Sequence, residues 1–269
     1  MHAVYVLSPD FGPQLYLSLR SLFSSGTTIN RVTIFSVGGS ISWEAGSLPI
    51  TFREVESKSK SYWMVNKTYL CQVESEDVLF LDTDTIIQEP IGEMIEKKEG
   101  EVVARRSTAR TLSSWDEQEW KKYLDENGVV TEIPVLNAGF LIFRGGIHQG
   151  MGREWSKIML DAWRRRLFGN GYHADQWSLP VVLGRREADC SLLGPKDHAF
   201  AWEGNDPDGA TVYHTGAANF FRCVRDLGHP SFVNADLPIP RPNVTWHYVK
   251  DRITRKWKEF LGRKSKVVK

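Results

Sequence analysis

The sequence predicts an α/β/α sandwich with a central, mostly parallel sheet and a basic C-terminal helix. Short apolar runs that suit buried strands alternate with amphipathic segments that suit helices, starting at the N-terminus. This alternation is typical of parallel sheets covered by helices. The composition, with 41% hydrophobic and 25% charged residues, is that of a chain able to bury a sizeable core.

The first elements follow the order strand, helix, strand. Residues 3–8 form an apolar run that ends in Ser-Pro-Asp, which indicates a buried strand and a turn. A helix is expected next, because Pro13 suits a first helical turn and the leucines after it share one face. The next buried strand is expected at residues 32–37, which end at a Gly-Gly pair.

The later elements follow from the same two periodicities. Helical spacing predicts three more helices, at residues 62–72, 115–126 and 153–168. Short apolar runs predict four more strands, at residues 78–81, 102–104, 140–143 and 212–213, the last one ending at His214.

The simplest division is one domain over residues 1–235 and a tail over residues 236–269. Three prolines at the start of the tail predict an extended stretch before a basic helix. Residues 250–269 have a net charge of +7, against −6 for the rest of the chain. Apolar residues at helical spacing in this segment suit either contact with an anionic membrane surface or docking on the domain.

Several classes of protein are not favoured. A net charge of +1 argues against a nucleic-acid-binding protein. The three cysteines have no metal-type spacing and favour neither a disulfide framework nor a structural zinc. No apolar run approaches the ~20 residues that span a bilayer, and no signal-peptide pattern is present. We therefore expect a cytoplasmic protein whose tail is the part suited to peripheral contact with the inner membrane surface.

The strongest local signal is the triplet Asp82-Thr83-Asp84, directly after the apolar run 78–81. Ligands of open α/β sheets bind at the carboxyl ends of strands, which is where this triplet is expected. Two carboxylates one residue apart can share a divalent ion, and Mg²⁺ and Mn²⁺ prefer such oxygen ligands and accept phosphates as further ligands. The alternative for the triplet is a solvated turn.

Three further motifs follow in order: Asn137-Ala138-Gly139 before the apolar run 140–143, then Asp175-Gln176, then His214-Thr215-Gly216. Together with the triplet, they resemble glycosyltransferase family 8 and neighbouring retaining enzymes of the GT-A fold, a Rossmann-like α/β/α sandwich. The resemblance covers residues 3–225 and makes residues 1–235 the catalytic domain. It departs after Gly216, where the family usually continues to Lys-Pro-Trp and this chain does not.

The resemblance implies three kinds of site residue. The ligands of a Mn²⁺ or Mg²⁺ ion would be Asp82, Asp84 and His214. The donor contacts would be Asp82, Thr83, Asn137, Ala138, Gly139 and Gly216, with Arg222 as the candidate substitute for the missing phosphate-binding lysine. The pair beside the anomeric carbon would be Asp175 and Gln176.

Some positions have a second interpretation. Gly139 would let backbone approach the ligand, or it is a glycine at a strand start. Asp175 would be a nucleophile, a stabiliser of an oxocarbenium-like centre or a general base, and it also suits a helix N-cap. Lys67 would lie near the pyrophosphate or be a solvated helix charge, and Ser8 and Asp10 would hold the nucleotide base or form a simple turn. Three histidines lack any ligand spacing and are expected to be ordinary: His173, His198 and His229.

The predicted function is metal-dependent transfer of a hexose from a nucleoside-diphosphate sugar to a hydroxyl of a glycan, lipid or protein. The family suggests a UDP-sugar donor, retention of anomeric configuration and a role in glycan biosynthesis. Some of the ten tryptophans are expected to line the cleft, because sugar rings stack on flat aromatic faces. Two alternatives are a haloacid-dehalogenase-like phosphatase with Asp82 as nucleophile and a catalytically inactive nucleotide-sugar-binding module.

Overall fold

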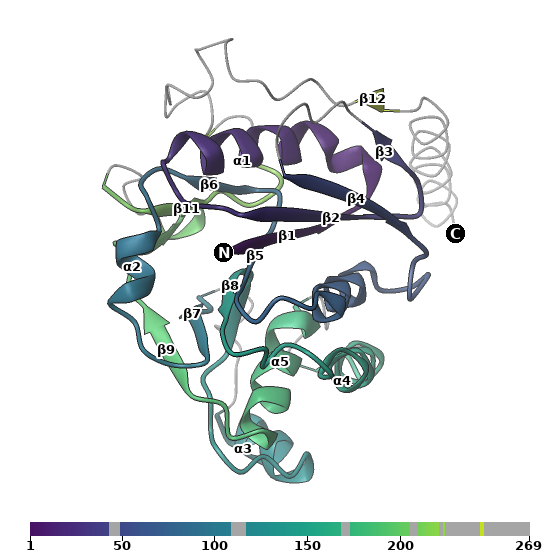
Figure 1. Cartoon of the computed structure of the whole chain (residues 1–269). Helices are drawn as coiled ribbons and strands as arrows, with labels where there is room; N and C mark the ends of the chain where they lie inside the picture. The colour runs from purple at the N-terminus through teal and green to yellow at the C-terminus, as the bar shows by residue number, and fades with distance from the viewer. Residues whose placement is uncertain are drawn as a thin grey trace, which may run out of the picture.

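The computed structural model describes residues 1–42, 49–108, 117–167, 173–204, 209–220, 223 and 243–244. Its centre is a sheet of seven strands in the order β4-β2-β1-β5-β8-β7-β9 (Figure 1). The strands are β1 (His2–Leu7), β2 (Arg31–Val37), β4 (Ile50–Val55), β5 (Val78–Leu81), β7 (Val102–Arg106), β8 (Leu136–Phe143) and β9 (Cys190–Leu193). Only β8 runs antiparallel to its neighbours in this sheet, so the predicted, mostly parallel sheet is confirmed.

Alternate residues of the central strands pack into two hydrophobic cores, one on each face of the sheet. Tyr5 and Leu7 of β1 pack with the leucines of α1, whereas Val4 and Val6 belong to the core on the opposite face. Figure 1 shows α1 on one side of the sheet and α4 and α5 on the other. The helices are α1 (Gly12–Ser24), the 3₁₀ helix η2 (Trp63–Gln72), α2 (Gly92–Glu96), α3 (Glu117–Glu126), α4 (Gly152–Arg164) and α5 (Ala174–Arg185).

A second, smaller sheet brings a distant histidine next to the acidic triplet. Its strands are β6 (Thr85–Ile87), β10 (His198–Phe200) and β11 (Val212–His214), in the order β10-β11-β6. β6 begins one residue after Asp84, and its Thr85 pairs with His214 of β11. The register of this antiparallel pair therefore places His214 beside the triplet.

The predicted tail is described only where two of its residues pair with the domain. β12 (Asn243–Val244) runs antiparallel to β3 (Ile41–Ser42). The expected basic helix within residues 250–269 lies outside the described residues, and the boundary at residue 235 stays a prediction. No helix in the described part of the chain is long and apolar enough to cross a membrane.

Three local predictions need correction. The predicted helix at 62–72 begins at Trp63 and has 3₁₀ geometry. The strand expected at 140–143 begins at Leu136, so the Asn-Ala-Gly motif lies inside β8 rather than before it. β8 pairs with β5 and β7 on its two sides, and this pairing overrides the low strand propensity of Asn and Gly. Asp175 does not cap α5, because the helix begins at Ala174 with His173 as its N-cap.

Candidate functional site

The acidic triplet leaves the carboxyl end of β5 in a turn fixed by backbone hydrogen bonds. The Asp82 N–H donates to the Gly139 carbonyl of β8 at 2.7 Å. The Asp82 carbonyl accepts from the Thr85 N–H at 3.2 Å and from the Thr85 hydroxyl at 2.7 Å. Because both sides of the turn are held, the directions of the two carboxylates are set by the sheet.

Asp82, Asp84 and His214 form a group that could hold a metal ion. One oxygen of each carboxylate and one imidazole nitrogen all lie within 4.8 Å of one another. His214 Nε2 is 3.2 Å from Asp84 Oδ1. His214 Nδ1 is buried and has no hydrogen-bond partner among the described residues, which is the kind of orphaned atom that a bound ion satisfies. The mixed oxygen and nitrogen donors suit a divalent ion such as Mn²⁺.

Gly139 makes room for this group. A Cβ at this position would lie 2.2 Å from His214 Cε1 and 2.9 Å from Asp82 Oδ2. The sequence predicted that Gly139 lets backbone approach the ligand or starts a strand. The strand-start alternative is wrong, because Gly139 lies inside β8. Gly139 lines the cavity at this site, so the approach of backbone to a ligand stays a prediction, and its missing side chain also leaves space for His214 and Asp82.

Lys67 joins the candidate metal-binding group, which consists of Asp82, Asp84 and His214, to Asp175. Its side chain comes from η2, is 3% exposed, and places Nζ 2.8 Å from Asp82 Oδ2 and 3.0 Å from Asp175 Oδ2. A third hydrogen bond runs to the Ala138 carbonyl at 3.1 Å. Burial alone would lower the pKa of Lys67, but the two carboxylates outweigh it and hold that pKa above its ordinary value. The alternative of a solvated helix charge is therefore wrong.

The two acids of the triplet differ in electrostatic environment. Burial raises the pKa of Asp82 above its usual value, and neighbouring Asp84 adds to this, although Lys67 opposes both. Burial also acts to raise the pKa of Asp84, but His214 and Lys67 together bring it below the usual value. The ionised form of Asp82 is thus stabilised less than that of Asp84, and a cation at this position would supply the missing positive charge.

Asp175 and Gln176 open α5, and neighbouring side chains fix both. Tyr62 donates its hydroxyl to Asp175 Oδ1 at 3.3 Å and accepts from the Asp175 N–H at 3.2 Å. Since Lys67 binds the other oxygen, Asp175 is held on both sides and is only 2% exposed. Gln176 Oε1 accepts from the Ser107 hydroxyl, and its Nε2 lies 3.2 Å from His173 Nδ1.

Three adjoining cavities form a groove past these residues. They measure about 630, 130 and 390 Å³, and Met64 lines all three. Lys67, Asp82 and Asp84 line the second and third cavities, so the metal-binding group lies between them. The third cavity ends against Asp175 and Gln176.

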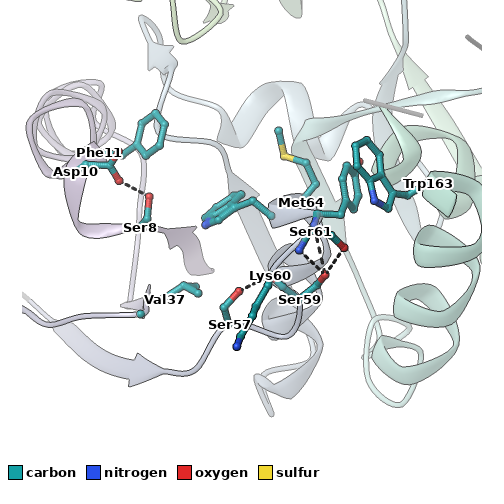
Figure 2. Close-up of a pocket in the computed structure, with 13 residues that line it drawn as sticks. Ser8, Asp10, Phe11, Val37, Ser57, Ser59, Lys60, Ser61, Met64 and Trp163 are labelled. Carbon is teal, nitrogen blue, oxygen red and sulfur yellow. Dashed lines mark hydrogen bonds between the residues drawn. The ribbon is translucent and has the colours of Figure 1, made fainter. Parts of the chain in front are cut away.

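Ser8 and Asp10 line the largest cavity (Figure 2). The Ser8 hydroxyl donates to the Asp10 carboxylate at the start of the 3₁₀ helix η1 (Pro9–Phe11), so these residues form a turn and also face the groove. The serine- and lysine-rich loop around Lys60 and the ring of Trp163 also line this cavity.

Not all of the remaining predicted donor contacts line a cavity. Thr83 lines the smallest cavity, and Asn137 and Gly216 line the one next to Asp175. The Ala138 side chain is buried in the core, and only its carbonyl reaches the site, through Lys67. Arg222 lies outside the described residues.

Of the three histidines expected to be ordinary surface or core residues, His173 lines the site and His198 is a core histidine as expected. His173 lines the cavity beside Gln176. His198 is fully buried, and its ring stacks on that of His214 at 5.7 Å between centroids. His229 lies outside the described residues. Sequence reasoning also missed Tyr62 and Ser107, which contact Asp175 and Gln176 across long sequence separations and have no motif of their own.

No family model and no curated protein matches the sequence. Solved structures that resemble the chain include glycosyltransferases. LgtC, a galactosyltransferase solved with donor and acceptor sugar analogues, is 14% identical with a TM-score of 0.56, over 88% of this chain and 98% of that one. The bifunctional glycosyltransferase WbbM is 14% identical with a TM-score of 0.52, over 90% of this chain and 45% of that one. For GlyE of Streptococcus pneumoniae TIGR4, the values are 14%, 0.50, 79% and 54%.

These neighbours establish the fold. LgtC is a family 8 glycosyltransferase, so the GT-A fold expected from the four motifs is confirmed. At 14% identity the likeness concerns the fold alone.

Proposed function

We propose that this chain is a metal-dependent glycosyltransferase that moves a hexose from a UDP-sugar to a hydroxyl acceptor. The observation that carries the proposal is the group Asp82, Asp84 and His214, which lies in a groove at the carboxyl end of β5. A metal-binding group at this edge of a GT-A sheet is suited to a nucleoside diphosphate. LgtC, which shares the fold, was solved with donor and acceptor sugar analogues.

The metal-binding group fits a divalent ion on two grounds. The Nδ1 of His214 has no hydrogen-bond partner among the described residues, and this atom and the space left by Gly139 both suit a ligand set assembled around an ion. Asp82, Asp84 and His214 would hold Mn²⁺ or Mg²⁺, which when bound supplies Lewis-acid neutralisation of the charge that grows on the leaving diphosphate.

The residues that line the three cavities suit three different parts of the donor. The largest, beside Ser8 and Asp10, is suited to the nucleoside, because serine and carboxylate oxygens can accept from ribose and base. The smallest, beside Thr83, leads to the metal-binding group and suits the diphosphate. Asn137 and Gly216 line the third cavity, where the hexose would lie. Arg222 is retained as the candidate second phosphate contact.

The surroundings of Asp175 favour a stabilising role over a nucleophilic one. Lys67 and Tyr62 hold its two oxygens, and a carboxylate bonded in this way has little freedom to attack carbon. Its charge can still stabilise an oxocarbenium-like centre and keep Lys67 in place. Gln176, fixed by Ser107, would then present its amide to the reacting sugar. This arrangement supports retention of configuration through attack on the face that the diphosphate leaves.

The test is release of UDP from a panel of UDP-hexoses, with Mn²⁺ and with a chelator. We expect turnover that needs the metal and that falls at least about a hundredfold in Asp82→Asn, as loss of several kcal/mol of charge stabilisation implies. Asp77→Asn, an exposed acid before the same strand, is the matched control and should be fully active.

Two outcomes would contradict the proposal. Metal-dependent UDP binding without turnover of any UDP-hexose would favour the inactive binding module. Phosphate release from phosphomonoesters, lost in Asp82→Asn, with no nucleotide binding would favour the phosphatase.

A further inference from the structure

Trp202 lies in the cavity that ends at Asp175 and Gln176. It follows β10 in a short 3₁₀ helix, η4 (Ala201–Glu203). Among the described residues that line this cavity, it is the only one with a phenyl, phenol or indole ring. Its indole Nε1 is buried and has no hydrogen-bond partner in the described part of the chain.

The indole is the outer layer of a stack anchored in the protein. Its ring lies parallel to that of Phe200, with centroids 4.5 Å apart and 13° between planes. The Arg105 guanidinium lies 4.0 Å from the centre of the Phe200 ring. Arg105 is itself fixed by an ion pair with Glu203 and a hydrogen bond to the His198 carbonyl. The indole is therefore held in one orientation before any ligand binds.

No ring of the described residues covers the second face of the indole. Among the described residues, only Phe200 and His214 place rings against it, and His214 meets it nearly perpendicularly, at 72° and 5.2 Å. Gly216 passes close by: a Cβ there would lie 3.8 Å from the indole, and its φ of +71° favours glycine. Trp202 lines the cavity, so part of its indole faces the space inside.

The two kinds of wall in this cavity suit two different ligands. Asn137, Lys67 and Gln176 offer polar groups near Asp175, where the hydroxyls of a donor hexose would be bound. Trp202 with Gly216 offers a flat apolar surface instead. A neutral acceptor has no diphosphate with which to bind the ion, so it depends on such apolar contact for its affinity.

We propose that the Trp202 indole stacks on the apolar face of a pyranose ring of the acceptor, so that the acceptor is a glycan or glycoside. This inference rests on the proposed glycosyltransferase function and deepens it by naming the acceptor class. It makes Trp202 a specificity-determining residue, since a flat ring selects sugars over simple alcohols.

The experiment compares Trp202→Leu, which removes the flat ring, with Trp202→Phe, which keeps one. Binding of methyl hexopyranosides is measured by saturation-transfer NMR without nucleotide, and transfer to the same glycosides is measured with UDP-hexose and Mn²⁺. In Trp202→Leu we expect the glycoside Kd and KM to rise about tenfold, equivalent to ~1.4 kcal/mol. Trp202→Phe should retain most of the wild-type values, and the loss in Trp202→Leu should be larger for the glycoside than for UDP with Mn²⁺.

Each other result contradicts the assignment in a different way. If the wild type binds none of the glycosides, the acceptor is not a sugar held at this ring. If Trp202→Leu weakens UDP-hexose binding but not UDP binding, the ring serves the donor sugar. If it weakens UDP binding with Mn²⁺ at least as much as glycoside binding, its role is to support His214. A wild type that binds no nucleotide would instead count against the proposed function, and the nucleotide-free glycoside measurement would still report on the indole.

Discussion

At Gly139, β8 passes so close to the metal-binding group that a methyl group would collide with His214. The added Cβ in Gly139→Ala would lie 2.2 Å from His214 Cε1, so the imidazole must move away from the two carboxylates. We expect metal-dependent UDP binding to be lost, with a stability cost of about 1–3 kcal/mol for overpacking. Calorimetry and urea unfolding measure the two effects.

Gly92→Ala is the control for this change. A Cβ at Gly92 meets nothing within 4 Å, and the residue lies in helix α2, where alanine is favourable. It should leave binding unchanged. Normal metal-dependent binding in Gly139→Ala would show that His214 is not needed in its observed position.

Lys67 neutralises the buried carboxylate of Asp175 and the half-buried carboxylate of Asp82, so its removal is predicted to destabilise the fold. In Lys67→Met, Asp82 and Asp175 would lose their shared cation, and breaking a buried ion pair in this way costs about 3–5 kcal/mol. Adding Asp175→Asn should restore part of the loss, because one unpaired charge is then gone. Urea unfolding of the single and double variants tests this, and a single-variant loss below ~1 kcal/mol would contradict the buried bridge.

The residues that belong to motifs could be predicted from the sequence, but the residues that contact them from other segments could not. Asp82, Asp84 and His214 follow from residue type and order, and the structure brings them together. Tyr62 and Trp202 could not be found, because their roles come from contacts between segments far apart in the chain.

At the scale of elements, η2 contributes to both the groove and the charge network. Asn66 accepts the Lys58 N–H at 2.8 Å and donates to the Ser57 hydroxyl and the Trp63 carbonyl, which fixes the loop beside the largest cavity. The next residue, Lys67, turns to the metal-binding group. A helix was predicted here, but its 3₁₀ form follows from tertiary contacts that periodicity does not reveal.

β1 begins with a histidine whose burial links stability to pH. His2 Nδ1 lies 2.6 Å from the Ser75 hydroxyl and Nε2 lies 2.8 Å from the Thr33 hydroxyl. Burial first, and the charges of Arg31 and Arg53 next, lower the pKa of His2 from 6.5 to about 4.

The sign of this effect follows from proton binding. Between pH 6.5 and about 4, the unfolded chain takes up a proton that the folded chain does not. The contribution of His2 to stability is therefore complete above pH 6.5 and declines as the pH falls toward 4. We expect Tm to fall less over this range in His2→Gln than in the wild type, as differential scanning calorimetry would measure. Parallel Tm profiles would contradict a neutral, buried His2.

At the scale of the whole molecule, five strands of the seven-stranded sheet were predicted, whereas its edge strands β4 and β9 and two strands of the smaller sheet were not. Continuous apolar runs such as 78–81 can be recognised in the sequence, and both faces of the sheet are buried as expected. β6 and β10 have three residues each, too few for a period to show. Yet their pairing with β11 brings His214 to the site. The ligand set was therefore predicted from the motifs and not from a predicted sheet.

The central claim is that the groove binds a nucleoside diphosphate through an ion held by Asp82, Asp84 and His214. Isothermal titration of the chain with UDP, with and without Mn²⁺, tests it most directly. We predict binding that requires Mn²⁺ and disappears in Asp84→Ala. Absence of UDP binding under both conditions, or equal binding with and without the metal, would contradict the account.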